Sequence, residues 1–234
     1  MRLCIIPARG GSKRIPRKNI KKFCGKPIIQ WPIETALNSL LFDKVIVSTD
    51  DNEIAKIAEK LGAEIPFIRP KSLSDDITGT IPVINHAINW INDNHSKVNY
   101  VCCIYATSPF LEKKYLRLGY EELLKSNSEY TFSATSFPFP IQRAIRITNT
   151  KRAQMLNPEH YHTRSQDLEE IFHDAGQFYW GKSDAWLSNK PIFAEHSIPI
   201  IIPRYKVQDI DNEEDWIRAE KMFRSNFEGI EYDS

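Results

Sequence analysis

Short, continuously apolar segments alternate with amphipathic helical segments through the first half of this chain. Strands are expected at residues 2–7, 44–49, 63–69, 99–106 and 130–137, and helices at residues 26–40, 50–62, 80–94 and 111–126. Parallel strands need a crossover connection, which a helix normally supplies. Strand segments without polar alternation are typical of a sheet that is buried on both faces. The alternation therefore predicts an α/β fold, with a mostly parallel sheet between two layers of helices.

Two of these helices carry signals at their ends. Pro27 is expected in the first turn of its helix, where a residue without an N–H is tolerated. Asp50 and Glu53 are expected to form a capping box at the start of the next helix, and Gly62 is expected to end it.

The alternation breaks between residues 136 and 171, which are polar and interrupted by prolines. Such a long segment without strands or helices is uncommon inside a compact domain and is usually functional. We expect residues 1–234 to form a single domain from which residues 137–170 protrude as an arm. After the arm, strands are expected near residues 176–181 and 197–203, and a closing helix at residues 212–226.

The first expected strand leads into the loop IIPARGGSKRIPRKN, which has five bases and no acid. It matches neither GxxxxGK[ST] nor GxGxxG. Its paired glycines allow a tight turn that presents N–H groups to an anion, and Arg9, Lys13 and Lys18 add positive charge. A solvated basic loop is the alternative, but ligands of open parallel sheets bind at the carboxyl ends of strands, where this loop lies. We interpret it as a phosphate site. Four bases nearby receive no role: Arg14, Arg17, Lys21 and Lys22.

Near the other end of the chain, VQDIDNEEDW places Asp209 and Asp211 two residues apart, so that on an extended chain both carboxylates point the same way. Mg²⁺ typically takes one or two carboxylates together with waters and substrate phosphates. Asp211 has a second explanation, because with Glu214 it could form the N-cap of the closing helix. A phosphate loop combined with a carboxylate metal site indicates phosphoryl or nucleotidyl transfer.

Other polar residues carry weaker signals. Thr107 and Ser108 follow the expected fourth strand, a suitable place for hydroxyls that line a cleft. The histidines and cysteines lack metal-ligand spacing. Cys102 and Cys103 are adjacent in one strand and must point to opposite faces, which makes a disulfide between them unfavourable.

Overall charge and hydropathy limit the partners. The net charge of +1 comes from 31 basic and 30 acidic residues, whereas a domain that binds nucleic acid is normally distinctly basic. No apolar run approaches the length of a membrane span, and the N-terminus shows no signal-peptide pattern. We therefore expect a cytoplasmic protein that binds neither nucleic acid nor a membrane.

Several motifs resemble those of a known family. In this order, IIPARGGSKRIPRKNI, VIVSTDDNEIA, RPKSLSDDITGT, ATSPF and VQDIDNEEDW are similar to motifs of the CMP-nonulosonate (CMP-N-acylneuraminate) synthetases, cytidylyltransferases that activate sialic acids. CCIYATSPF, SATSFPFPIQRA, HTRSQDLEE and HDAGQFYWG resemble more narrowly the pseudaminic acid cytidylyltransferases. The resemblance covers nearly the whole chain. It implies a three-layer α/β/α, Rossmann-like nucleotidyltransferase that uses Mg²⁺ to transfer CMP from CTP to the anomeric 2-hydroxyl of a nonulosonic acid, giving pyrophosphate.

The resemblance also implies roles for individual residues. Arg9, Lys13 and Asp211 would be catalytic. The nucleotide site would comprise Ala8, Arg9, Gly10, Gly11, Ser12, Lys13, Asn19, Arg69 and Thr80, with Arg9, Lys13 and Asn19 on the phosphates and the last two on cytosine and ribose. Asp209 and Asp211 would bind the metal. The sugar site would comprise Thr107, Ser108, Gln142, Arg143, Arg164, Gln177 and Tyr179, with Arg164 on the sugar carboxylate. The arm would reach across a homodimer and complete the sugar pocket of the partner.

Three departures from the sialic acid synthetases fall on the sugar side. Tyr105 and Ala106 stand where those enzymes often have Gln-Pro, Gln142 stands where they have a lysine, and Ala175-Gly176-Gln177 replaces Asn-Gly-Ala. These departures favour pseudaminic acid as the substrate. Sialic and legionaminic acids remain alternatives with the same chemistry. A non-catalytic nucleotide-binding module and a nucleotide-sugar glycosyltransferase are alternatives of other classes.

Overall fold

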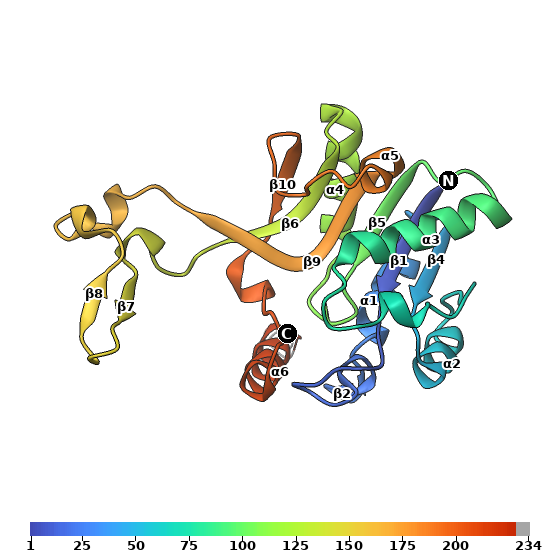
Figure 1. Ribbon diagram of the computed structural model, residues 1–234, viewed down its shortest axis with the longest axis horizontal. Coiled ribbons are helices and arrows are strands. Elements are labelled where there is room, and N and C mark those ends of the chain that lie inside the picture. The colour runs from blue at the N-terminus through green and yellow to red at the C-terminus, as the bar shows by residue number, and fades with distance from the viewer. Residues whose placement is uncertain (228–234) are drawn as a thin grey trace, which may run out of the picture.

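The computed structural model describes residues 1–227 and is built on a six-stranded central sheet (Figure 1). Its strands are β1 (Arg2–Pro7), β4 (Lys44–Ser48), β5 (Tyr100–Ile104), β6 (Tyr130–Ser136), β9 (Phe172–Lys182) and β10 (Ser197–Ile201), in the spatial order β10-β6-β9-β5-β1-β4. β9 runs antiparallel to both of its neighbours, and the other neighbouring pairs are parallel. The predicted mostly parallel sheet is confirmed.

Helices cover both faces of this sheet. The helices α1 (Gln30–Ser39), α2 (Asn52–Lys60) and α4 (Lys113–Ser126) pack on one face, and α3 (Thr80–Asn94) and α5 (Ser183–Leu187) on the other. Cys102 lies in the first of these cores and Cys103 in the second, and both thiols are free, as predicted. α6 (Glu213–Phe227) packs beside the sheet, near the small hairpin of β2 (Lys22–Phe23) and β3 (Lys26–Pro27). Within residues 1–227, no helix is both long and apolar enough to cross a membrane.

The strand predicted at residues 63–69 is wrong. Only Glu64 joins the sheet, through an isolated bridge to Ile46. Pro66 follows two residues later, and a proline has no N–H with which to continue a ladder of hydrogen bonds.

Two predictions about helix ends are also wrong. Pro27 lies in the β2–β3 hairpin rather than in a helix, and α1 begins at Gln30. The cap of α2 is Asp51 rather than Asp50, since its carboxylate accepts from the backbone N–H groups of Glu53 and Ile54. The predicted end of that helix at Gly62 is confirmed, because Gly62 follows the C-cap with a φ of +93° that favours glycine.

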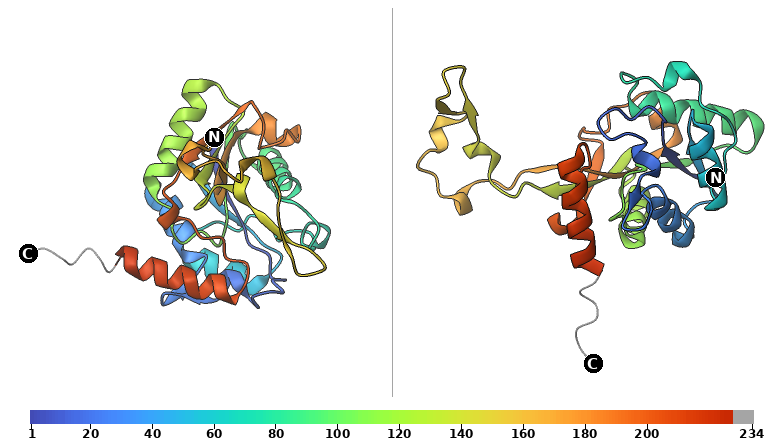
Figure 2. Two further views of the ribbon diagram at one scale, coloured as in Figure 1. Left: turned by 90° about the vertical axis from the view of Figure 1, so that its left-hand side faces the viewer. Right: turned by 90° about the horizontal axis from the view of Figure 1, so that it is seen from below.

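Residues 137–170 leave the body of the molecule as an arm (Figure 2). β6 and β9 lead into it, and it carries the antiparallel hairpin of β7 (Ile145–Ile147) and β8 (Ala153–Met155). The short 3-10 turns of the chain are η1 (Lys18–Ile20), η2 (Lys71–Leu73), η3 (Ile141–Arg143), η4 (Pro158–His160), η5 (Ser165–Asp167) and η6 (Arg204–Lys206). The break in the sequence alternation coincides with this arm.

Gly181 on β9 permits close packing of two buried rings. A Cβ there would lie 2.5 Å from Nε1 of Trp186 and 2.6 Å from ring carbons of Tyr130. We expect Gly181→Ala to lower the free energy of unfolding by about 1–3 kcal/mol, measured by urea denaturation, because overpacking forces these rings to move. Gly11→Ala is the matched control, since its Cβ would meet nothing within 4 Å. An equal loss in both variants would contradict the role of the rings.

Candidate active site

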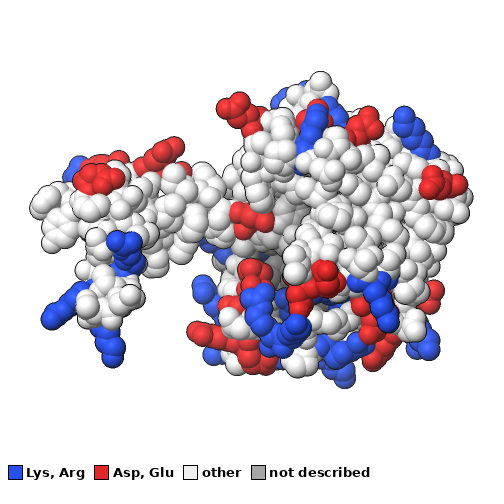
Figure 3. All heavy atoms as spheres, viewed as in Figure 1, with Lys and Arg blue, Asp and Glu red and all other residues white. Residues whose placement is uncertain are grey.

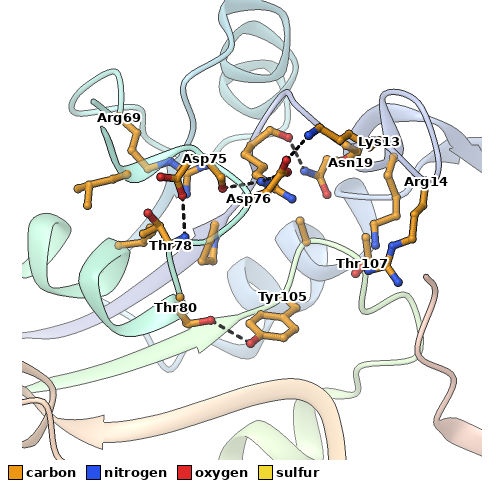
Figure 4. Close-up of a pocket in the computed structure, with 18 of the residues that line it drawn as sticks. Lys13, Arg14, Asn19, Arg69, Asp75, Asp76, Thr78, Thr80, Tyr105 and Thr107 are labelled. Carbon is orange, nitrogen blue, oxygen red and sulfur yellow. Dashed lines mark hydrogen bonds and ion pairs between the residues drawn. The ribbon is translucent and has the colours of Figure 1, made fainter. Parts of the chain in front are cut away.

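A cleft of about 450 Å³ opens where β1 and β5 end (Figure 4). The loop after β1 contributes Arg9, Ser12, Lys13, Arg14, Ile15, Lys18 and Asn19; the segment after β5 contributes Tyr105, Ala106 and Thr107; the approach to α3 contributes Arg69, Leu73, Asp75, Asp76, Thr78, Gly79 and Thr80; and Asp211 precedes α6. Figure 4 shows Lys13 and Arg69 on opposite sides of the pocket, with Asp75 and Asp76 between them. This is the expected place for a ligand in an open sheet of parallel strands.

The glycines of the basic loop have different roles. The N–H of Gly10 donates to Oδ1 of Asp50 at 3.0 Å, and a Cβ on Gly10 would lie 2.7 Å from Oδ2 of Asp51. Gly10 therefore permits a close approach to the turn after β4, and its N–H is already used, contrary to the prediction that both glycines present N–H groups to an anion. A Cβ on Gly11 would meet nothing within 4 Å, and Gly11 is exposed.

Asn19 shapes the same loop from inside. Its side chain is buried, and Nδ2 donates to the carbonyl oxygen of Arg9 at 2.9 Å. Asn19 lines the cleft, but this hydrogen bond makes it a support for the backbone that carries Arg9.

Three bases left without a role by the sequence pair with acids of other segments. Arg17 forms hydrogen bonds with both carboxylate oxygens of Asp51, at 2.5 and 3.0 Å, and with Glu53 at 2.6 Å. Nζ of Lys21 lies 2.7 Å from Oε2 of Glu213. Arg14 pairs with Asp211, as described next. The loop is thereby fastened to the N-terminal turns of α2 and α6.

Asp211 is the carboxylate that reaches the cleft from the C-terminal part of the chain. Its Oδ1 accepts from Nη2 of Arg14 at 2.9 Å and lies 3.7 Å from Nζ of Lys18. Burial lowers the pKa of Lys18, while the neighbouring Asp211 and Asp209 act in the opposite direction. Asp211 thus faces two bases of the loop.

The alternative role of Asp211 as a helix cap is wrong. Asn212 is the cap: its Oδ1 accepts from the N–H of Asp215, and Oδ2 of Asp215 accepts from the N–H of Asn212 at 3.1 Å. This reciprocal pair leaves the Asp211 carboxylate available for the cleft.

Asp209 does not line the cleft, and it is exposed to solvent. Its pKa is nevertheless raised, first by partial loss of solvation and then by the negative charge of Asp211, so the two carboxylates are close enough to interact. Two hard oxygen donors fit Mg²⁺, which usually completes its shell with water and phosphate oxygens. Residues 1–227 contain no group of three or more His, Cys, Asp or Glu suited to a metal, so a metal on this pair would depend on such added oxygens.

Arg9 and Lys13 meet an acid that the sequence did not suggest as their partner. Nη1 of Arg9 donates to Oδ1 of Asp76 at 2.7 Å and to the carbonyl oxygen of Asp75 at 2.5 Å. Lys13 pairs with the other carboxylate oxygen of Asp76. Both acids lie in RPKSLSDDITGT, but no local pattern in that motif reveals that they face a loop more than 60 residues earlier.

The side of the cleft formed by Arg69 and α3 offers hydrogen bonds to a ligand. Arg69 is buried, and its Nε donates to Oγ of Ser74 at 3.1 Å. Its Nη2 forms an ion pair with Oδ1 of Asp50 at 3.7 Å, too far for a hydrogen bond, and has no hydrogen-bond partner among the described residues. Burial lowers the pKa of this guanidinium. The hydroxyls of Thr80 and Tyr105 are hydrogen-bonded at 3.0 Å nearby. A buried donor that makes no hydrogen bond is costly, so this site suits a ligand with an acceptor atom.

Of the residues expected to bind sugar, only Thr107 lines the cleft. Ser108, in the segment after β5, and Gln177 and Tyr179, on β9, are buried beside it. Ser108 donates to the carbonyl oxygen of Gly176 at 3.3 Å, Gln177 to that of Lys206 at 2.7 Å, and the hydroxyl of Tyr179 to the carboxylate of Asp174. These three side chains support the wall of the site.

The remaining predicted sugar residues lie on the arm. Gln142 donates to the carbonyl oxygen of Glu169 at 2.9 Å, and Arg143 to the hydroxyl of Ser165 at 3.5 Å. Arg164 is exposed and pairs with Asp167 at 2.9 Å. None of the three lines the cleft of its own chain.

Comparisons with known proteins agree with this geometry. The family described as "Cytidylyltransferase" matches residues 3–231. A pseudaminic acid cytidylyltransferase of Campylobacter jejuni is 47% identical over 97% of this chain and 97% of its own length. A CMP-N,N'-diacetyllegionaminic acid synthase of Legionella pneumophila is 28% identical over 97% of this chain and 98% of its own length. The solved structure of a CMP:2-keto-3-deoxy-manno-octonic acid synthetase complexed with CTP superposes with a TM-score of 0.70 at 14% identity, covering 97% of this chain and 99% of that one, which confirms the predicted fold class.

The Asp51–Arg17 pair makes the stability of the loop anchor depend on pH. Hydrogen bonding to Arg17 is the main cause that lowers the pKa of Asp51 from 3.8 to about 2. A carboxylate with a depressed pKa stabilises the fold fully above its unfolded pKa, and this contribution is lost as the pH falls from about 4 toward 2. Asp51→Asn keeps an oxygen for the cap of α2 but removes the charge.

We therefore expect Asp51→Asn to lower the free energy of unfolding by about 1 kcal/mol at neutral pH, a value reduced for the partial exposure of the pair. Urea denaturation at several pH values measures it, and the difference from wild type should shrink as the pH falls from about 4 to about 2 and disappear below that. Asp93→Asn, an exposed change on α3, is the control. A difference that stays constant with pH would contradict the role of the charge.

Proposed function

This chain belongs to the cytidylyltransferase family, and from that relation we propose that it transfers CMP from CTP to the anomeric hydroxyl of a nonulosonic acid and releases pyrophosphate. Pseudaminic acid is the proposed sugar, because the relative that is 47% identical over nearly the full length of both chains is named for that substrate. The observation that carries the proposal is the cleft itself, a volume suited to a small ligand that is lined by bases of the loop after β1 and by Asp211, which pairs with one of them, Arg14.

In the proposed reaction a bond forms between the sugar oxygen and the α-phosphorus, and the bond from that phosphorus to the bridging oxygen breaks. The proton of the attacking hydroxyl passes to water. Negative charge builds on the departing pyrophosphate. Arg9 and Lys13 both contact Asp76 in the cleft, so the two cations lie close enough together to stabilise that charge jointly.

The nucleoside is proposed to lie toward α3. Nη2 of Arg69 lies 3.7 Å from Oδ1 of Asp50 and makes no hydrogen bond to a described residue, so it is a donor for a carbonyl or ribose oxygen. The Thr80–Tyr105 hydroxyl pair offers further contacts. Gly79 precedes Thr80 at the N-cap of α3 and leaves open space beside the backbone.

Asp209 and Asp211 are the residues proposed to hold Mg²⁺. When bound, the metal would neutralise phosphate charge and orient the phosphate oxygens. Arg14 and Lys18 both contact the Asp211 carboxylate and hold it at the cleft.

The arm supports a proposed homodimer. It exposes several large apolar side chains: Phe139, Ile141, Ile145, Ile147, Leu156 and Tyr161. Contiguous exposed apolar surface usually marks an interface. Figure 3 shows the arm projecting from the body, with a mostly uncharged surface and with bases at the end of the β7–β8 hairpin. Because Arg164 lies outside the cleft of its own chain, its proposed pairing with a sugar carboxylate requires the cleft of a partner. We also propose a cytoplasmic location for this enzyme.

Asp211→Asn tests the reaction. We expect pyrophosphate release from CTP, Mg²⁺ and pseudaminic acid to fall about 100-fold or more, the usual cost of removing a fixed group that stabilises the transition state. Release by the wild type should be faster with pseudaminic acid than with legionaminic or sialic acid, and removal of the metal by a chelator should stop it.

Glu214→Gln is the matched control, because it removes one charge from the same exposed segment outside the cleft. Full activity of Asp211→Asn would contradict the metal role, and faster release with legionaminic acid would shift the proposed substrate to that sugar.

Mixing two inactive variants tests the arm. Arg164→Ala and Asp211→Ala are each expected to lose activity, Arg164→Ala through a higher KM for the sugar rather than for CTP. A heterodimer would contain one site with both residues intact, so an equal mixture after subunit exchange should recover about a quarter of wild-type activity. An inactive mixture with confirmed exchange, or a fully active monomer by light scattering, would contradict a shared site.

A further inference from the structure

Asp76 stands between the two bases assigned to the departing pyrophosphate. One of its carboxylate oxygens accepts from Arg9 at 2.7 Å, and the other pairs with Lys13. All three side chains line the same cleft. A carboxylate that presents two oxygens to two cations occupies them as two oxygens of a phosphate group would.

The loop that carries Asp76 is folded locally so that this carboxylate faces the bases. Oδ1 of Asp75 accepts from the N–H groups of Ile77 at 3.0 Å and Thr78 at 2.6 Å, which forms a tight turn. The carbonyl oxygen of Asp75 accepts from Arg9 at 2.5 Å. The neighbouring acid thus serves the turn, and the carboxylate of Asp76 alone pairs with the two bases.

Asp76 differs from the two other acids that line the cleft, Asp211 and Asp75. Asp211 has Asp209 beside it and fits a metal, whereas both oxygens of Asp76 are engaged by cations and the Asp75 carboxylate faces backbone N–H groups. The proposed reaction gives Asp76 no part.

We propose that Asp76 is an internal competitor of pyrophosphate. It pairs with Arg9 and Lys13 in the empty cleft, is displaced by the triphosphate of CTP, and returns to the same bases as pyrophosphate leaves. This inference rests on the proposed function, which places the triphosphate on these two residues.

The strengths of the contacts fit this role. The side chains of Asp76 and Lys13 are 42% and 79% exposed, and exposed ion pairs are weak. A triphosphate with several charges can therefore replace Asp76 at little cost. While Asp76 occupies the two bases, the cleft cannot bind phosphate through them, so the apparent affinity for pyrophosphate is lower. A lower affinity favours release of this highly charged product.

Binding of inorganic pyrophosphate tests the inference. The full chain is titrated with pyrophosphate and with CTP by calorimetry, in buffer with a chelator and no divalent metal, as wild type, Asp76→Asn and Asp93→Asn. We expect Asp76→Asn to bind pyrophosphate about three- to ten-fold more tightly than wild type, as expected when weak competing ion pairs are lost. In the activity assay it should be inhibited by correspondingly lower pyrophosphate. Asp93→Asn removes an exposed charge from α3 outside the cleft and should bind as wild type does.

Asp76→Ala removes the same carboxylate without an amide and should also bind more tightly. Unchanged or weaker pyrophosphate binding by the folded Asp76 variants overturns the inference, and indicates that Asp76 positions Arg9 and Lys13 instead. If wild-type protein binds neither CTP nor pyrophosphate, also when Mg²⁺ is restored, the proposed function fails rather than this inference. Thermal unfolding of each variant shows whether it is folded.

Discussion

The loop after β1 carries five bases and no acid, so its repulsive charge must be balanced by distant segments. The structure balances it at three places. The turn before α2 pairs with Arg17, the approach to α3 pairs with Arg9 and Lys13, and the segment before α6 pairs with Arg14. Figure 3 shows the resulting mixture of acids and bases over α6 and β2. The pairings with the approach to α3 and with the segment before α6 bring walls to the cleft, and the pairing with the turn before α2 anchors the loop, so the charge of one loop organises the site.

The same pairings divide the bases by function. Arg17 is held by a capping carboxylate and belongs to the anchor of the loop. Arg9 and Lys13 pair only through exposed contacts that a charged ligand can replace. An apolar contact also anchors the loop: Ile15 is buried in the cluster that contains Trp216 of α6. A rigid anchor therefore lies next to bases that can exchange partners, as transfer of a charged group requires.

Local patterns predicted most of the central fold, because burial on both faces leaves a strong apolar signal in strands such as β1 and β5. They failed where the deciding contact was not local. In the segment expected as a strand at residues 63–69, Glu64 makes one bridge and Pro66 prevents further pairing. At the start of α2 the cap is Asp51, whereas Asp50 accepts from the distant Gly10. Two adjacent acids look alike in a sequence, and their separate partners distinguish them only after folding.

By itself, the sequence determined the α/β class, the basic loop at the carboxyl end of the first strand, and the carboxylate pair that includes Asp211, because periodicity and local composition are properties of neighbouring residues. Its motifs also indicated the family. Only the tertiary structure decided that Asp76 pairs with Arg9 and Lys13, and that Arg164 lies outside the cleft of its own chain. Pairings across more than 60 residues, and the direction in which an arm extends, depend on how strands and helices pack, and no local pattern encodes them.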